Sequence, residues 1–108
     1  MIKRPEIVCL CGSTRFMDAY HAANRKFSLE GKIVLTVEIV TSEETPDIEG
    51  RDPETKRKLD ELHFRKIDLA DTVFVCNVGG YVGESTRNEI AYAKQLGKPI
   101  QYLEPLSE

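Results

Sequence analysis

Glu89 is a side chain in this sequence whose chemistry could break a bond. A carboxylate about one turn inside a helix can act as a nucleophile or a general base. The sequence also indicates structural roles for Glu89 and for His63. Thr86-x-x-Glu89 matches a capping box, and His63 lies on the apolar stripe of a predicted helix, as a core histidine does.

A second candidate site is the segment Gly12-Ser13-Thr14-Arg15, which joins a predicted strand to a predicted helix. A helix N-terminus and an arginine together favour an anion, so Gly12, Ser13 and Arg15 are predicted to bind a phosphate or similar group. The alternative is that Ser13 or Thr14 only caps the helix while Arg15 faces solvent. The segment lacks the lysine of a P-loop, and the chain has no GxGxxG.

Three glycines fall in one loop, at residues 77–84. Glycine lets a backbone approach a flat or charged ligand closely, and the same loop contains Tyr81. A helix is expected to begin just afterwards, at Ser85 or Thr86. The substrate-binding residues predicted here are Gly79, Gly80, Tyr81, Gly83 and Ser85.

The cysteines and histidines do not form a recognisable metal motif. Cys9, Cys11 and Cys76 lie in apolar runs without CxxC spacing, which favours buried reduced thiols over metal or redox chemistry. His21 and His63 are far apart in sequence. The sequence therefore predicts no metal and no cofactor; a flavin in particular would need aromatic partners that are missing.

Four short apolar runs alternate with three segments of helical period, the pattern of a parallel sheet with crossover helices. The predicted strands are residues 7–11, 32–37, 72–76 and 100–103. The predicted helices begin after Arg15 and end at Gly31, run from Pro53 to about Leu69, and run from Ser85 or Thr86 to the Gly97-Lys98-Pro99 stop.

Right-handed crossovers then favour one α/β domain over residues 1–108, with a flavodoxin-like (Rossmann-like) sheet of order 2-1-3-4 and helices on both faces. In that order the loops leaving the first and third strands flank a crevice at the carboxyl ends of the strands. These loops are the two that carry the candidate residues above. The topology is therefore expected to bring them to one site.

The composition limits the possible partners. With 15 Lys and Arg against 18 Asp and Glu, the 108-residue chain has a net charge of −3 and is 41% hydrophobic. The acidic balance argues against duplex nucleic acid or an anionic membrane, while a free nucleotide needs only one local anion site. No signal-peptide-like start and no membrane span is recognisable, so a cytoplasmic protein is predicted.

Two further expectations concern segments outside the core. The acidic segment at residues 38–52 has no periodicity and is predicted to act as a lid over the crevice. Sheet edges and apolar loop residues such as Ile39, Val40 and Tyr81 predict a homodimer or a larger homo-oligomer that covers them.

Several short motifs, taken in order, resemble the nucleoside 2-deoxyribosyltransferases and the related deoxynucleoside monophosphate N-glycosidases. The resemblance covers nearly the whole chain. The matching segments are Cys11-Gly12-Ser13-x-Arg15, Ala70-Asp71-x-Val73-x-Val75, Gly83, Glu89-Ile90-Ala91-Tyr92-Ala93 and Gly97-Lys98-Pro99.

This resemblance implies cleavage or transfer at the N-glycosidic bond of a nucleoside or nucleoside 5′-monophosphate, with hydrolysis and transfer both open. Glu89 would attack C1′ of the sugar, Gly12, Ser13 and Arg15 would lie beside the sugar and a 5′-phosphate, and neighbouring subunits would complete one another's sites. His63 stands where relatives carry an aspartate that handles the sugar or the leaving base, and histidine exchanges a proton near neutral pH, so the resemblance implies His63 as the acid that assists departure of the base. Asn88 stands where relatives carry a tyrosine, and Tyr81 could stack on or orient the nucleoside. The alternative is a non-catalytic nucleotide-binding or sensing module that uses the same crevice.

Overall fold

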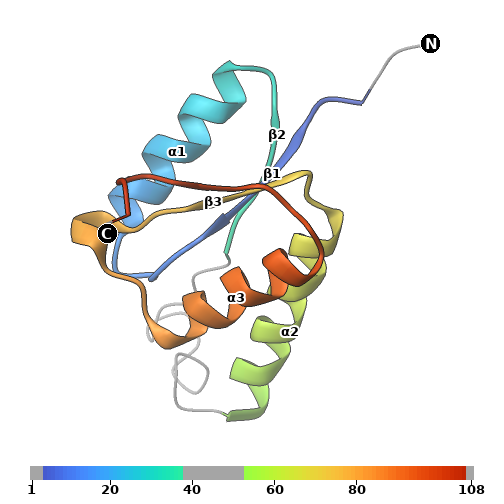
Figure 1. Ribbon diagram of the computed structural model, residues 1–108, viewed down its shortest axis with the longest axis vertical. Coiled ribbons are helices and arrows are strands. Elements are labelled where there is room, and N and C mark those ends of the chain that lie inside the picture. Colours follow the sequence, from blue (N-terminus) through green and yellow to red (C-terminus); the bar gives the residue numbers. More distant parts are fainter. Residues whose placement is uncertain (1–3, 38–52, 107–108) are drawn as a thin grey trace.

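The computed structural model describes residues 4–37 and 53–106 (Figure 1). A short 3-10 turn, η1 (Val78–Gly80), follows the third strand. The other elements in chain order are β1 (Ile7–Cys11), α1 (Met17–Leu29), β2 (Ile33–Leu35), α2 (Pro53–Leu69), β3 (Thr72–Val75), α3 (Glu84–Gln95) and β4 (Ile100–Tyr102).

The strands form one parallel sheet of order β2-β1-β3-β4, which confirms the predicted flavodoxin-like topology. β1 lies inside the sheet and pairs with β3 from Val8 opposite Thr72 to Cys11 opposite Val75. Because side chains alternate along a strand, Val8 and Leu10 face one side of the sheet and Cys9 and Cys11 face the other.

Helices cover both faces of this sheet, as predicted (Figure 1). On one face, Tyr20, Ala23 and Phe27 of α1 pack against alternate residues of β1 and β3. On the opposite face, α2 and α3 pack side by side, with Ile67 and Ala93 fully buried among the strand residues. This second layer contains the thiols of Cys9 and Cys11, so the helices there decide what surrounds them.

Element boundaries differ from the predictions mainly at β2 and α3, while β3 and β4 each end one residue earlier than predicted. β2 has three residues instead of six, because it pairs only with residues 7–9 of β1 and has no strand beyond it in the described sheet. α3 begins at Glu84 rather than at Ser85 or Thr86, because the carbonyl of Gly83 already accepts a hydrogen bond from the backbone N–H of Arg87.

Two expectations fall outside the described residues. The predicted lid at residues 38–52, together with Ile39 and Val40, lies in the part of the chain that the structure does not describe.

Among the described residues, no helix combines the length and the apolar character needed to cross a membrane.

Candidate functional site

The structure brings the two predicted catalytic side chains together. His63 comes from α2 and Glu89 from α3, and His63 Nε2 lies 3.7 Å from Glu89 Oε1. Only 6% of the His63 side chain and 13% of the Glu89 side chain are exposed. Two ionisable groups are thus held against each other in a nearly closed layer, where water screens their charges poorly.

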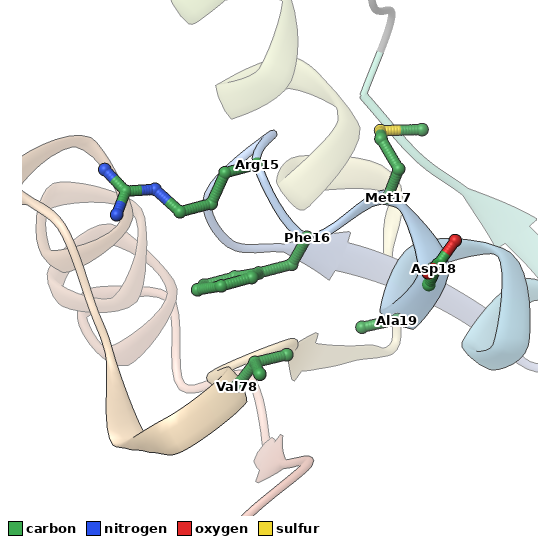
Figure 2. Close-up of a pocket in the computed structure, with 6 residues that line it drawn as sticks. All are labelled: Arg15, Phe16, Met17, Asp18, Ala19 and Val78. Carbon is green, nitrogen blue, oxygen red and sulfur yellow. The ribbon is translucent and has the colours of Figure 1, made fainter.

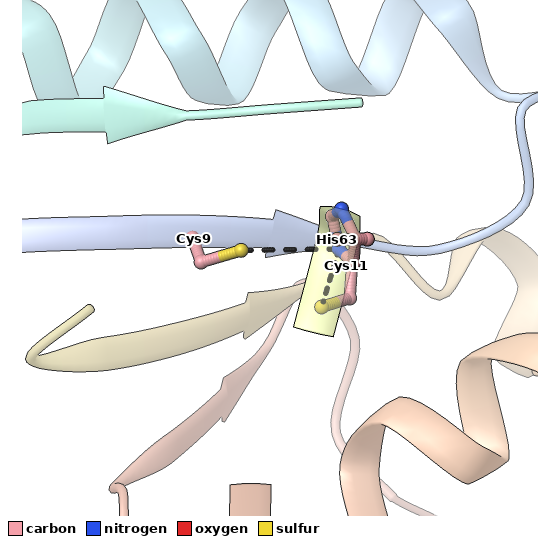
Figure 3. A group of neighbouring side chains, drawn as sticks. All are labelled: Cys9, Cys11 and His63. Atoms are coloured by element: carbon pink, nitrogen blue, oxygen red, sulfur yellow. Dashed lines mark hydrogen bonds between the residues drawn. The ribbon is translucent and has the colours of Figure 1, made fainter. Parts of the chain in front are cut away.

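The thiols of Cys9 and Cys11, on β1, lie beside His63 and Glu89 and complete this group of side chains. Cys11 Sγ lies 3.3 Å and Cys9 Sγ 3.8 Å from the same His63 Nε2, as Figure 3 shows. Both thiols reach the histidine because residues two apart on a strand project from the same face. We call Cys9, Cys11, His63 and Glu89 the buried cluster.

The pKa values of the cluster are perturbed by burial and by one another. Burial raises the pKa of Glu89 above its ordinary value, although the neighbouring His63 opposes this shift. Burial alone would lower the pKa of His63, but the hydrogen bond with Cys9 and the charge of Glu89 outweigh it and raise that pKa. Strongly perturbed groups that lie together are typical of functional sites.

The pKa values of the two thiols are shifted in opposite directions. A hydrogen bond from Cys11 lowers the pKa of Cys9 to about 6, with additional help from His63. The same bond, together with burial, raises the pKa of Cys11. The hydrogen bond between the two thiols therefore favours a single thiolate in the pair over two.

His63 is buried, as the core interpretation expected, but its hydrogen bonds are incomplete. Its Nδ1 atom is buried and has no hydrogen-bond partner among the described residues. A buried unpaired polar atom lowers stability by about 1–3 kcal/mol. The imidazole is thus held at an energetic cost, with its only close polar neighbours on the Nε2 side.

The capping-box interpretation of Thr86 and Glu89 is wrong. Gly83, not Thr86, is the residue that precedes the helix, and no side chain caps this end. Thr86 is the third residue of α3 and is buried. Glu89 points toward His63 instead of back to the helix start.

The cap interpretation of Ser13 or Thr14 is also wrong. The helix begins later, with Phe16 in the capping position and no side-chain cap. Ser13 Oγ accepts a hydrogen bond from the backbone N–H of Arg15 at 3.3 Å, which fixes a local turn. Gly12 has φ +145°, and a Cβ there would lie 3.0 Å from the carbonyl oxygen of Cys76. The glycine is therefore required where the two loops meet.

Arg15 connects the two candidate loops. Its guanidinium carbon lies 4.5 Å from the ring centre of Tyr81, and the ring of Phe16 meets the same tyrosine edge to face at 5.9 Å. A pocket of about 390 Å³ lies here, and Figure 2 shows it bounded by Phe16 above Val78. Its lining residues are Arg15, Phe16, Met17, Asp18, Ala19 and Val78. The residues of the buried cluster do not line this pocket.

The glycine loop is held by a residue that sequence reasoning missed. The backbone N–H of Gly79 donates to the Glu104 carboxylate at 2.7 Å, and Asn77 exchanges two hydrogen bonds with the Glu104 backbone. Gly79 and Gly80 have positive φ and are exposed. These two glycines therefore allow a turn that hydrogen bonds hold against Glu104, just after β4.

Gly83, Tyr81 and Ser85 occupy the start of α3. A Cβ on Gly83 would lie 3.2 Å from the hydroxyl of Tyr81, so the glycine allows this ring to lie close to the backbone. Tyr81 is 43% exposed, and Ser85 is exposed in the first turn of α3. All three follow β3 at the carboxyl edge of the sheet, and Tyr81 lies beside Arg15.

Sequence reasoning predicted buried thiols and did not place them beside His63. The burial is confirmed for all three cysteines, but two of them contact the histidine. The usable signal was the Cys-x-Cys alternation on β1 combined with a histidine on a helix that crosses the same face. The distance in sequence between His21 and His63 carried no information about this cluster.

Comparison with known proteins gave no match. The chain matches no protein-family model and no curated protein sequence. The family resemblance described above therefore stays a prediction.

Proposed function

We propose that this protein cleaves or transfers the N-glycosidic bond of a nucleoside or nucleoside 5′-monophosphate, with Glu89 as nucleophile. The observation that carries the proposal is the 3.7 Å approach of His63 to Glu89. Residues from two different helices, 26 positions apart (89 − 63), are held together in a nearly closed layer at the carboxyl half of β1. A carboxylate and a proton donor are the pair this bond requires.

The chemistry follows from the charges of the pair. The bond between C1′ and the base nitrogen breaks through an oxocarbenium-like state, and an anionic carboxylate next to C1′ stabilises it. The Glu89 carboxylate then bonds to C1′, while a protonated His63 gives its proton to the departing base. Water or a second base next attacks C1′ and gives its proton to the now neutral His63. The bond between C1′ and Glu89 breaks, which yields hydrolysis or transfer.

Binding of a 5′-phosphate is supported by the two helix starts. α1 and α3 begin after β1 and β3, and neither start is capped by a described side chain. Free backbone N–H groups at a helix start favour an anion. Arg15 lies between them, stacked on Tyr81, where it can add a charge-assisted hydrogen bond.

A second candidate function is a non-catalytic nucleotide-binding module. It is favoured by the position of the pocket, which Arg15 and Val78 line but Glu89 and His63 do not. A nucleotide held only in that pocket would be bound without reaching the carboxylate. The acidic net charge agrees with a free nucleotide rather than duplex nucleic acid as partner in either case.

We also propose a cytoplasmic homodimer or larger homo-oligomer. Tyr81, at the edge of the site, and Leu103, at the end of β4, are each 43% exposed. A second copy covering this edge would bury both and could close the site. Light scattering at micromolar concentration tests this, and a clean monomer would exclude it.

The decisive experiment is incubation with a panel of nucleosides and their 5′-monophosphates, followed by chromatography for free base. Release of base from one sugar class supports the enzyme, and addition of a second free base distinguishes transfer from hydrolysis. Intact-mass analysis of the acid-quenched protein should show a glycosyl adduct. Tight binding of a monophosphate without base release would favour the binding module.

A further inference from the structure

Cys9, Cys11 and His63 present metal-ligating atoms to one point. Their two Sγ atoms and one imidazole nitrogen all lie within 4.8 Å of one another (Figure 3). The thiols come from the central strand and the imidazole from α2, so each ligand is held by a rigid element. We propose that these three residues bind one thiophilic divalent metal ion, Zn²⁺ being the best fit. Glu89 Oε1 lies 3.7 Å from His63 Nε2 but outside this group of mutually close atoms, so the carboxylate would have to move toward the ion to become the fourth ligand.

The distances agree with tetrahedral coordination. Zn–S bonds of about 2.3 Å and Zn–N bonds of about 2.0–2.1 Å place sulfur and nitrogen about 3.6 Å apart at a tetrahedral angle. The two measured sulfur–nitrogen distances, 3.3 and 3.8 Å, bracket that value. Glu89 Oε1 lies 3.7 Å from His63 Nε2, close to the roughly 3.4 Å expected for nitrogen and oxygen on one zinc ion.

The donor set selects the kind of metal. Two thiolates and one imidazole are soft and borderline ligands, which favour Zn²⁺ over Mg²⁺ or Ca²⁺. The ion would also balance the charge of two thiolates in a layer where Cys9 and Cys11 are fully buried. Cys11 must lose its proton on binding, so the affinity should rise with pH.

The site lacks one usual support. A zinc-ligating histidine commonly donates its other ring N–H to a carboxylate or carbonyl, whereas Nδ1 of His63 has no partner among the described residues. Removing such a partner weakens metal affinity about 10–100-fold. We therefore expect reversible binding rather than a permanent structural metal.

Metal binding would have one consequence that rests on the proposed function. An ion bound to His63 and Glu89 would occupy the nitrogen and the carboxylate needed for sugar chemistry, so it would inhibit turnover. The binding itself does not depend on that function. It is therefore measured directly, without any nucleoside.

The test is titration of the reduced, metal-free, full-length protein with Co²⁺, which gives an intense thiolate-to-cobalt absorption and visible bands of a tetrahedral site. We expect one Co²⁺ per chain, displaced by one equivalent of Zn²⁺. X-ray absorption at the zinc edge of the unmodified protein should then report two sulfur ligands. Absence of the thiolate band, or a zinc ion without sulfur ligands, would overturn the proposal even if no variant folds.

Matched variants locate the site. Cys11→Ser and His63→Ala should each weaken Co²⁺ binding at least tenfold, and Cys11→Ser should also lower the thiolate band. Cys76→Ser removes the buried thiol on the opposite face of the sheet, and His21→Ala removes an exposed histidine of α1. Both should bind as the unmodified protein does. If Cys76→Ser loses the band, or a folded Cys11→Ser keeps it at full intensity, the ion binds elsewhere.

Discussion

Charged groups at the two ends of the β1–β3 pair are used in opposite ways. At the amino end, the Asp71 carboxylate accepts hydrogen bonds from two nitrogens of Arg4, at 2.8 and 3.1 Å, and from the backbone N–H of Ile7 at 2.8 Å. Near the carboxyl end, His63 and Glu89 lie 3.7 Å apart, with His63 Nδ1 unpaired.

The pKa values follow this difference. Hydrogen bonds from Arg4 and Ile7 lower the pKa of Asp71 to about 2, so the anion is well solvated by the protein. Burial instead raises the pKa of Glu89. An exposed, satisfied carboxylate that joins the starts of two strands is explained by folding, whereas a buried and incompletely paired cluster is not. That contrast is why we assign the chemistry to the carboxyl end.

Loss of Glu89 should have the largest effect. We expect Glu89→Ala to fold and bind nucleotide but to lose several orders of magnitude in turnover, as removal of a covalent nucleophile does. Glu84→Ala, in the first turn of the same helix, is the matched control and should stay largely active. A Glu89→Ala rate above about a tenth of the unmodified rate, a loss under ~1.4 kcal/mol in barrier, would remove Glu89 as nucleophile.

His63 should determine the alkaline side of the pH profile. In the proposed mechanism a protonated His63 gives its proton to the base. The pKa of His63 lies above the ordinary 6.5, so turnover should fall as pH rises through that raised value. Ionised Glu89 is needed as well, so turnover should rise with pH through a value above the ordinary 4.5.

In His63→Ala we expect turnover to fall about 10²–10⁴-fold and the alkaline decline to disappear. His21→Ala controls for loss of an exposed histidine. Should the decline persist in a folded His63→Ala, another group supplies the proton.

Arg15 should affect phosphate binding without affecting the sugar chemistry. Arg15→Ala should weaken binding of nucleoside 5′-monophosphates by roughly 1.5–3 kcal/mol, about 10- to 150-fold, as lost charge-assisted hydrogen bonds do. Binding of the unphosphorylated nucleoside should change little. Calorimetry on both ligands, with Arg25→Ala as an exposed control on α1, separates the two, and equal affinity for the monophosphate would refute the anion site.

The smallest expected effect lies at the amino end and concerns stability alone. The folded pKa of Asp71 is lowered from 3.8 to about 2, so its contribution is present above pH 3.8 and is lost as pH falls through 2. Acid unfolding of Asp71→Asn should therefore show a flatter slope in this range, with turnover unchanged.

Asp60→Asn is the control for the acid slope, because it breaks an ion pair with Lys56 inside α2 and joins no strands. A slope unchanged in Asp71→Asn would mean that the carboxylate contributes nothing to the pairing of β1 and β3.

The sequence by itself determined the fold. Alternating strand and helix periods predicted the sheet order, and Pro53 and Leu69 were correctly placed as the limits of α2. These features are local or follow from chain chirality, since a right-handed crossover leaves few ways to return to a parallel sheet. The predicted boundaries were wrong where the local sequence pattern competed with tertiary pairing. One example is β2, which is limited to the residues that pair with β1.

Only the tertiary structure decided what surrounds His63. Cys11 and His63 are 52 residues apart in the chain, and no periodicity relates a strand residue to one particular helix residue across a layer. The capping box failed for the same reason, because Glu89 was assigned by a four-residue pattern although its side chain is turned to another helix. Side-chain partners across a core depend on how helices cross the sheet, and that angle is set by packing of all layers together.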